Sequence, residues 1–354
     1  MRSIRAILPL AALLAPLAFR ARSAEPENAP GYQWKLPKGF PVPYVPPDNP
    51  MTEAKVELGR YLFYDTRMSV NGKASCATCH KQDLAFTDGR ATGLGATGEP
   101  HTRSAMSLVN IAYSGALTWV SPNLKKLEEQ ALTPMFGEHP VELGLRGGDK
   151  FLPTIRGDAK YRGLFPIAYP SDADPFTVPN VTRAIASFER SIISASSPYD
   201  RYHYGGDDSA VSEAAKQGEK LFFNTKLHCF RCHGGFNFSD ATISANAPDR
   251  RIEFHNTAVN LAPNDTAKFK TPTLRNIAVT APYMHDGSIP TLEAVIDHYA
   301  AGGRAHDNPN KDPEISGFEI SAQDRANLIA FLETLTDPEL LHDASFANPW
   351  VSAR

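Results

Sequence analysis

Every cysteine of the chain belongs to one of two short motifs. The pairs are Cys76 with Cys79 and Cys229 with Cys232, and each pair is followed at once by a histidine, His80 or His233. C-x-x-C-H is the attachment signature of c-type haem, in which both thiols add to vinyl groups and the histidine reaches the iron. Disulfides or a zinc site also use paired cysteines, but neither requires a histidine at this position in both pairs. The sequence therefore predicts two covalently bound haem c groups with His80 and His233 as proximal ligands.

The segments that must position these motifs are repeated as well. A G-x-x-L-F pattern precedes each motif, at residues 59–63 and 218–222. An amphipathic helix follows each motif, and its apolar residues recur at helical spacing. They are Val181, Ile185, Phe188 and Ile192 in the first helix, and Leu328, Phe331, Leu332 and Leu335 in the second, for which Ser321 is the expected N-cap. Because no strand pattern is strong, we predict a mainly helical fold of two tandem cytochrome c-like domains with long loop insertions.

The rest of the chain divides around these repeats. Residues 1–23 contain four Arg and no acid, an apolar run of 14 residues and a plausible cleavage site, which is the layout of a signal peptide. The proline-rich segment 24–50 is expected to form an extended arm. We place the N-terminal domain at 51–205 and the C-terminal domain at 206–345, with a linker at 196–209.

Composition and charge narrow the possible function classes. The chain has 354 residues, of which 42% are hydrophobic and 21% charged, which excludes a disordered or collagen-like protein. Without the first 23 residues, 32 basic and 39 acidic residues remain, so the sequence shows no basic stripe for a nucleic-acid partner. A bilayer-spanning helix needs ~20 apolar residues, more than any run provides. We therefore expect an exported, periplasmic protein with no membrane span in the mature chain.

A predicted helix after the second haem motif bears on the ligands of its iron. Residues 290–303 have a proline near the start and glycines after the end, as helices usually do. One face carries Leu292, Val295, Ile296 and Tyr299. This face turns Tyr299 inward, whereas His298 is rotated by about 100° from it. A tyrosine on a buried face is more often a core residue than a ligand, so spacing alone leaves both interpretations open.

Over residues 52–337 the sequence resembles the bacterial di-haem cytochrome c peroxidases and their relative MauG. The most specific stretch runs from F-K-T-P-T-L-R-N at residues 269–276, through H-D-G beginning at His285, to Tyr299. In this family the residue fourteen positions after that histidine is the distal ligand of the C-terminal haem, a methionine in ordinary peroxidases and a tyrosine in MauG-like enzymes. The resemblance thus implies that Tyr299 binds the second iron. Because a hard, anionic phenolate stabilises oxidised iron, this haem is expected to store oxidising equivalents.

The resemblance also implies a peroxide site at the N-terminal haem. Gln130, Pro134 and Glu142 match residues that line the distal pocket in the family. An acid in this place moves a proton between the two peroxide oxygens. The segment is two residues longer than the common spacing between that Gln and Glu, so Glu138 is a rival base.

Two further positions concern electron transfer and the resting state of the first haem. Trp119 matches the tryptophan that lies between the two haems in the family, which implies that its indole relays electrons. Peroxidases of the family cap the resting haem with a histidine about sixteen residues after the first motif. Ala96 stands at that place, so we expect no such cap, with His101 nearby as a substitute in one redox state.

The family binds a calcium ion between its domains. The backbone carbonyls that hold it match Thr280 and Pro282, which implies a calcium site here. The family's asparagine ligand is replaced by Ser104, but backbone and water oxygens can still satisfy calcium.

Residues 117–144 resemble one MauG-like branch in particular, the MbnH-like di-haem enzymes of methanobactin operons. Such an enzyme converts a tryptophan of its copper-binding partner protein, MbnP, to kynurenine. The resemblance implies that hydrogen peroxide oxidises the N-terminal haem, that Trp119 relays an electron from the C-terminal haem, and that the resulting two-ferryl state oxidises an aromatic side chain of a partner protein. MauG has a surface tryptophan that relays electrons. Leu227 stands in its place, so the exit route is expected to differ.

Two other function classes remain open. One is a detoxifying di-haem cytochrome c peroxidase that takes electrons from a small redox protein, and a tyrosine ligand at position 299 argues against it. The other is a non-enzymatic di-haem electron carrier, in which Gln130, Pro134 and Glu142 would have no role.

Overall fold

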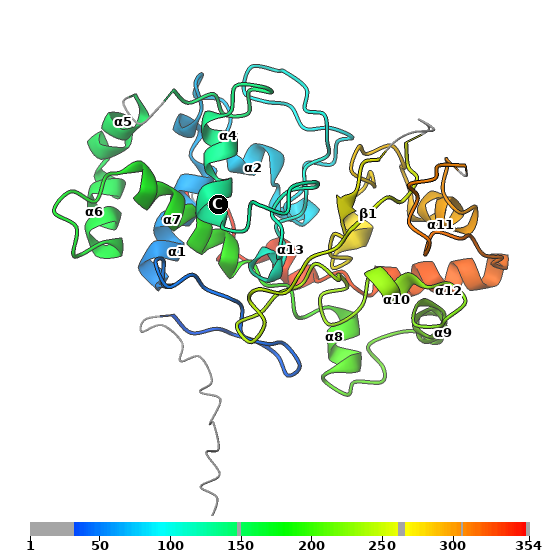
Figure 1. The fold of residues 1–354 in the computed structure, drawn as a ribbon. Helices are drawn as coiled ribbons and strands as arrows, with labels where there is room; N and C mark the ends of the chain where they lie inside the picture. Colours follow the sequence, from blue (N-terminus) through cyan, green and yellow to red (C-terminus); the bar gives the residue numbers. More distant parts are fainter. Residues whose placement is uncertain (1–31, 147–149, 261–265, 306, 352–354) are drawn as a thin grey trace, which may run out of the picture.

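A computed structural model describes residues 32–146, 150–260, 266–305 and 307–351 (Figure 1). The predicted signal peptide lies outside these residues. In the described part of the chain, no helix is both long and apolar enough to cross a bilayer. Its only paired strands are two residues long, β1 (Phe254–His255) and β2 (Phe269–Lys270), and they run antiparallel. The prediction of a mainly helical fold is therefore confirmed.

The first half of the molecule is built on two crossed helices. Its described helices are α1 (Glu53–Tyr64), α2 (Cys76–Cys79), α3 (Leu127–Gln130), α4 (Leu132–Phe136), α5 (Phe151–Gly157), α6 (Ala159–Ala168) and α7 (Val178–Ser191), with 3-10 turns η1 (Thr66–Met68), η2 (Gln82–Leu84) and η3 (Ile111–Tyr113). Helices α1 and α7 pack together, and a Cβ added at Gly59 would collide with the backbone carbonyl of Ala184. The glycine of the first G-x-x-L-F pattern therefore permits a close backbone approach. All four apolar residues predicted for one face of α7 are buried.

The second half repeats this arrangement. Its described elements are α8 (Pro198–His203), α9 (Glu213–Phe222), α10 (Cys229–Cys232), the two strands, the 3-10 turn η4 (Ile277–Val279), α11 (Leu292–Ala300), α12 (Ala322–Glu333) and α13 (Pro338–His342). Helices α9 and α12 cross, and a Cβ at Gly218 would collide with the carbonyl of Asn327. The hydroxyl of Ser321 caps α12 as predicted. Leu335 lies two residues beyond the end of α12 but is fully buried, like the rest of the predicted face.

A pair of asparagines extends the repeat beyond the predicted segments. Asn110 and Asn276 both adopt left-handed backbone conformations, with φ of 55° and 61°, which asparagine tolerates better than most residues. The backbone N–H of Asn110 donates to the carbonyl of Ile192 after α7, and that of Asn276 donates to Leu335 after α12. Each half thus ties the segment after its haem motif to the end of its closing helix.

The predicted linker at 196–209 is wrong in part, because it contains α8. Ser197 caps this helix and Asp200 is buried within it. Both carboxylate oxygens of Asp200 accept hydrogen bonds from the guanidinium of Arg275, at 2.8 and 2.9 Å. A buried pair of this kind fixes its two segments relative to each other, since neither charge can be left without its partner. The segment is therefore a packed part of the second half.

Both ends of the described chain cross between the halves. The ring of Phe40, in a segment without helix or strand, packs against Phe236, with ring centroids 4.9 Å apart. Leu340 and Leu341 of α13 follow the second half in sequence but belong to the hydrophobic core of the first. Figure 1 shows α13 between α7 on one side and the α8–α12 group on the other. These crossings hold the two halves together.

Candidate functional site

Both C-x-x-C-H motifs present their histidine in the same way. Each motif forms a one-turn helix, α2 or α10, with the histidine at its C-cap. His80 Nδ1 donates to the carbonyl oxygen of Phe86 at 2.8 Å, and His233 Nδ1 donates to that of Phe238 at 3.0 Å. These bonds place the proton on Nδ1 and leave the lone pair on Nε2, the arrangement typical of metal-bound histidine. Burial lowers the pKa of both histidines, which keeps the rings neutral.

The motif cysteines agree with haem attachment. None of the four forms a disulfide, so every thiol is available for a thioether bond. Each motif also opens onto a cavity that other predicted residues line. The N-terminal cavity, of about 340 Å³, is lined by Cys76, Cys79, His80, Gln130, Pro134 and Glu142. The C-terminal cavity, of about 210 Å³, is lined by Cys229, Cys232, His233 and Tyr299. The residues present therefore fit one haem c in each half.

Tyr299 is the polar side chain that α11 contributes to the C-terminal cavity. Burial raises the pKa of its hydroxyl, so a phenolate here would need a cation such as ferric iron beside it. His298 points elsewhere, and its Nε2 donates to the carbonyl of Thr257 at 2.8 Å. The predicted apolar face of α11 is not its only buried face, because His298, which lies off that face, is only 5% exposed. Helix α11 is covered on more than one side.

Only one of the two acids predicted as the base lines the N-terminal cavity. Glu142 lines the cavity with Gln130 from α3 and Pro134 from α4. Its Oε1 lies 3.8 Å from His101 Nδ1. Burial raises the pKa of Glu142, and the charge of His101 counteracts that rise. Glu138 is exposed and does not line the cavity, so the geometry favours Glu142 as the base.

Trp119 lines both haem cavities. Its Nε1 donates to the carbonyl of Ser104 at 3.0 Å, which fixes the indole plane. Its own carbonyl accepts a hydrogen bond from the backbone N–H of Lys270 at 2.9 Å. Burial lowers the pKa of Lys270 to about 8. The position between the cavities supports the proposed electron relay.

The residues expected at the calcium site line a third cavity of about 100 Å³. Thr280, Pro282 and Ser104 all contribute to it, and the Ser104 hydroxyl already donates to the carbonyl of Met284 at 3.0 Å. None of the described residues that line it carries a carboxylate, whereas buried Lys270 does line it. Calcium prefers oxygen ligands with several carboxylates. This lining does not by itself favour calcium, so no functional step below depends on that ion.

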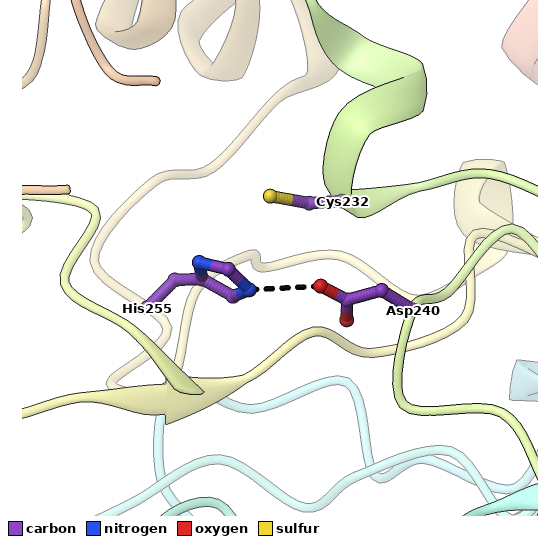
Figure 2. Close-up of side chains that lie close together, drawn as sticks. All are labelled: Cys232, Asp240 and His255. Carbon is purple, nitrogen blue, oxygen red and sulfur yellow. Dashed lines mark hydrogen bonds and ion pairs between the residues drawn. The ribbon is translucent and has the colours of Figure 1, made fainter. Parts of the chain in front are cut away.

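Sequence reasoning did not find a charged cluster at the second haem motif. The ring of His255 lies between two carboxylates, with Nε2 2.8 Å from Asp240 and Nδ1 2.6 Å from Asp312. Figure 2 shows His255 and Asp240 beside the thiol of Cys232. The bond to Asp240 is the largest cause that raises the pKa of His255 to about 11. Although Cys232, Asp240 and His255 lie close enough to hold a metal, Cys232 belongs to the haem motif, so we assign the cluster to the haem edge.

Comparison with known proteins agrees with the geometry. The profile of the di-haem cytochrome c peroxidases matches residues 53–209, and that of RoxA-like, cytochrome c-like proteins matches 268–301. The methylamine utilization protein MauG of Methylorubrum extorquens is 35% identical over 90% of this chain and 84% of its own. The cytochrome-c peroxidase IdrP1 of a Pseudomonas species is 33% identical over 95% of this chain and 94% of its own.

Solved structures show the same similarity. A MauG-like protein associated with microbial copper homeostasis has a TM-score of 0.87 and 39% identity, covering 91% of this chain and all of its own. The di-haem peroxidase BthA of Burkholderia thailandensis has a TM-score of 0.67 at 21% identity, over 88% of this chain and 95% of its own, and shares the fold.

Proposed function

The chain belongs to the family of MauG and the di-haem cytochrome c peroxidases, and within that family we propose that it uses hydrogen peroxide to oxidise an aromatic side chain of a partner protein. Members of this family are haem-dependent peroxide oxidoreductases that carry covalently bound haem c. The two halves would then be tandem cytochrome c domains, with the boundary before α8 instead of the predicted 205/206, because that helix packs in the second half. Export to the periplasm through residues 1–23 belongs to the same proposal.

The observation that carries this proposal is the phenol of Tyr299 in the cavity of the second haem motif. Buried, this phenol is a poor acid, and iron binding would favour its ionised form. An anionic oxygen ligand lowers the reduction potential of a haem iron, since it stabilises the more positive oxidation states. A haem held in this way is suited to keep oxidising equivalents until a slow substrate arrives. A scavenging peroxidase instead needs a second haem that accepts electrons readily.

The N-terminal cavity supplies the groups that handle peroxide. A haem c held by His80 would supply the iron that binds peroxide, in the cavity that Glu142 and Gln130 line. The Glu142 carboxylate accepts a proton from one peroxide oxygen and returns it to the other, while the Gln130 amide orients the molecule through hydrogen bonds. Hydrogen peroxide takes up two electrons and two protons and leaves as two waters. The partner protein supplies the electrons.

Trp119 would carry electrons between the two haems, because its indole lines both cavities. The exit to the partner must differ from that of MauG. Leu227, at the position of the MauG surface tryptophan, is buried and lines the C-terminal cavity, and an aliphatic side chain cannot hold a radical. Electrons would therefore leave the partner through other groups at the surface.

We infer that the oxidised side chain is a tryptophan and that kynurenine is its product: two molecules of hydrogen peroxide take four electrons from the indole, which gains two oxygen atoms as N-formylkynurenine, and hydrolysis then releases formate. The support is the 39% identity to a MauG-like protein associated with copper homeostasis and the similarity of residues 117–144 to the MbnH-like branch. The partner would then be a copper-binding protein of the MbnP type, whose new aromatic amine could serve as a metal ligand.

The experiment adds hydrogen peroxide to the fully oxidised protein with both haems attached. Mössbauer spectra report the oxidation state of each iron, and mass spectrometry follows oxygen insertion into tryptophan of candidate copper-binding partners. We expect both irons to be oxidised beyond the ferric state for minutes, and the signal to decay faster when the partner is added.

Other results would point to the alternatives. Fast turnover with a reduced small cytochrome, and no change in any partner, would identify a detoxifying peroxidase. An unreactive protein would be an electron carrier.

A further inference from the structure

Glu189 is a buried acid of the N-terminal haem cavity that the proposed function does not use. It lies near the end of α7, one turn after Ile185, and both side chains line the cavity. Glu189 is only 6% exposed. Carboxylates are rarely buried without a partner, since an unpaired charge in a low-dielectric interior is costly.

One carboxyl oxygen of this acid lacks a hydrogen-bond partner in the described structure. Its Oε2 is shielded from solvent and has no hydrogen-bond partner among the described residues. The neighbouring Arg190 is turned away, and its guanidinium holds both oxygens of Glu128 at 2.7 and 2.8 Å. Burial raises the pKa of Glu189 to about 8, a rise that Arg190 opposes and Glu128 supports. Burial therefore favours the neutral form of this acid, and a positive charge placed beside it would favour the ionised form.

The acid lies close to the haem attachment point. After burial, the negative charge of Glu189 is the largest influence that raises the pKa of the Cys76 thiol. Cys76 is the first predicted thioether residue and lines the same cavity as Glu189, so the charge of a haem bound there would act on this acid. Charges interact strongly in a poorly solvated site. An added positive charge on the haem would favour the ionised acid, and an added electron would favour the protonated one.

We propose that Glu189 is the proton-exchanging acid of the N-terminal haem, which releases a proton when that haem is oxidised and takes one up when it is reduced. Turnover of peroxide consumes two protons for two electrons, so the cavity needs a group that brings protons in with electrons. Glu142 cannot do this alone, because it moves a proton from one peroxide oxygen to the other. This inference rests on the haem site of the proposed function and is independent of the partner protein.

Other charged groups surround the same cavity and must be separated from Glu189. Arg190 comes from α7, Glu128 from α3 and the thiol of Cys76 from α2. Glu142, His101 and Arg103 also line the cavity. Glu142 is 36% exposed and lies beside His101, and its charge also acts on the thiols of Cys76 and Cys79. Glu189 and Glu142 are therefore replaced in separate variants, so that each proton can be assigned to one acid.

The test is the reduction potential of the N-terminal haem, measured between pH 6 and pH 10 on the full chain with both haems and no peroxide. In the parent protein we expect the potential to fall by about 59 mV for each tenfold drop in proton concentration over part of this range, the slope of one proton per electron. Glu189→Gln should remove that slope and hold the potential at the parent's low-pH value, because glutamine imitates the neutral acid.

The matched control is Glu129→Gln. Glu129 is exposed on α3 and does not line the cavity, so this variant should keep the parent slope. An unchanged slope in Glu189→Gln, or a flat potential in the parent, would overturn the proposal. Should the glutamine variant not fold, redox-induced infrared difference spectra of the parent provide the measurement. A protonated carboxyl band must disappear on oxidation of the N-terminal haem, and its absence would equally overturn the proposal.

Discussion

The two halves of the molecule share one frame and differ in what faces the open side of each haem. Both cross two helices at a glycine, Gly59 or Gly218. Both also fix the proximal histidine through Nδ1 to a backbone carbonyl. The open side differs, because the first cavity has the acid Glu142 and the second has the phenol of Tyr299.

The difference lies in the inserted segments. Helices α3 and α4 bring Gln130 and Pro134 to the first cavity, and α11 brings Tyr299 to the second. We therefore propose that the repeated frame holds each haem, whereas the inserted segments decide whether its iron binds peroxide or a side chain of the protein. The following predictions test this division.

The largest effect is expected at the open side of the first cavity. Glu142→Gln should slow the reaction with peroxide by roughly 10²–10⁴-fold, the usual contribution of a general base. Stopped-flow absorbance measures the rate. Glu138→Gln is the control, because Glu138 is exposed and outside the cavity. An equal loss of rate in both variants would show that Glu142 is not the base.

The same acid predicts a pH profile. Burial raises the pKa of Glu142, and the base works only when it is ionised, so the rate should rise with pH through that raised pKa and then level off. His101→Gln removes the neighbour that lowers the pKa, so the rise should move to higher pH. A profile that stays in place would show that His101 has no influence on Glu142.

The shared frame predicts equal effects in both halves. Gly59→Ala and Gly218→Ala each place a methyl group against a backbone carbonyl of the partner helix, which should lower the free energy of unfolding by ~1–3 kcal/mol. Thermal unfolding of the holoprotein checks this. Gly163→Ala is the control, because a Cβ there has open space around it. A large loss in one half alone would contradict the equivalence of the two crossings.

The smallest effect concerns the link between the halves. Trp119→Phe removes the indole that lines both cavities, and we expect electron exchange between the haems to slow by about tenfold, equivalent to ~1.4 kcal/mol in the barrier. Rapid-mixing spectroscopy of peroxide-treated protein measures the exchange. Both haems should remain attached. Exchange at the parent rate would exclude Trp119 as the relay.

The sequence predicts the features that depend on residues close together in the chain. The haem motifs, the Ser321 cap and the buried face of α7 are local patterns, and all three occur in the structure. The helix within the predicted linker was missed although Ser197, Pro198 and Asp200 form a local start signal; its packing depends on the pairing of Asp200 with Arg275 across 75 residues. The equivalence of Asn110 and Asn276 was missed for the same reason, since each acts through a distant backbone contact.

Charged groups beside the haem edges were also beyond prediction. Asp312 contacts His255 although the two residues are 57 positions apart in the chain. The sequence around Glu189 gives no sign that this helix residue lines a cavity together with the first haem motif. The pKa shifts of His255 and Glu189 arise from burial and neighbouring charges, which depend on the folded structure.

The proposed function is tested most directly by identifying the side chain that binds the C-terminal iron. Resonance Raman spectra of the oxidised parent should contain tyrosinate vibrations that vanish in Tyr299→Met. The reduction potential of that haem should rise by on the order of 0.1 V or more, given the wide range that axial ligands span. If the parent lacks these vibrations and the potential is unchanged in the variant, Tyr299 does not bind the iron, and the second half is an ordinary electron acceptor.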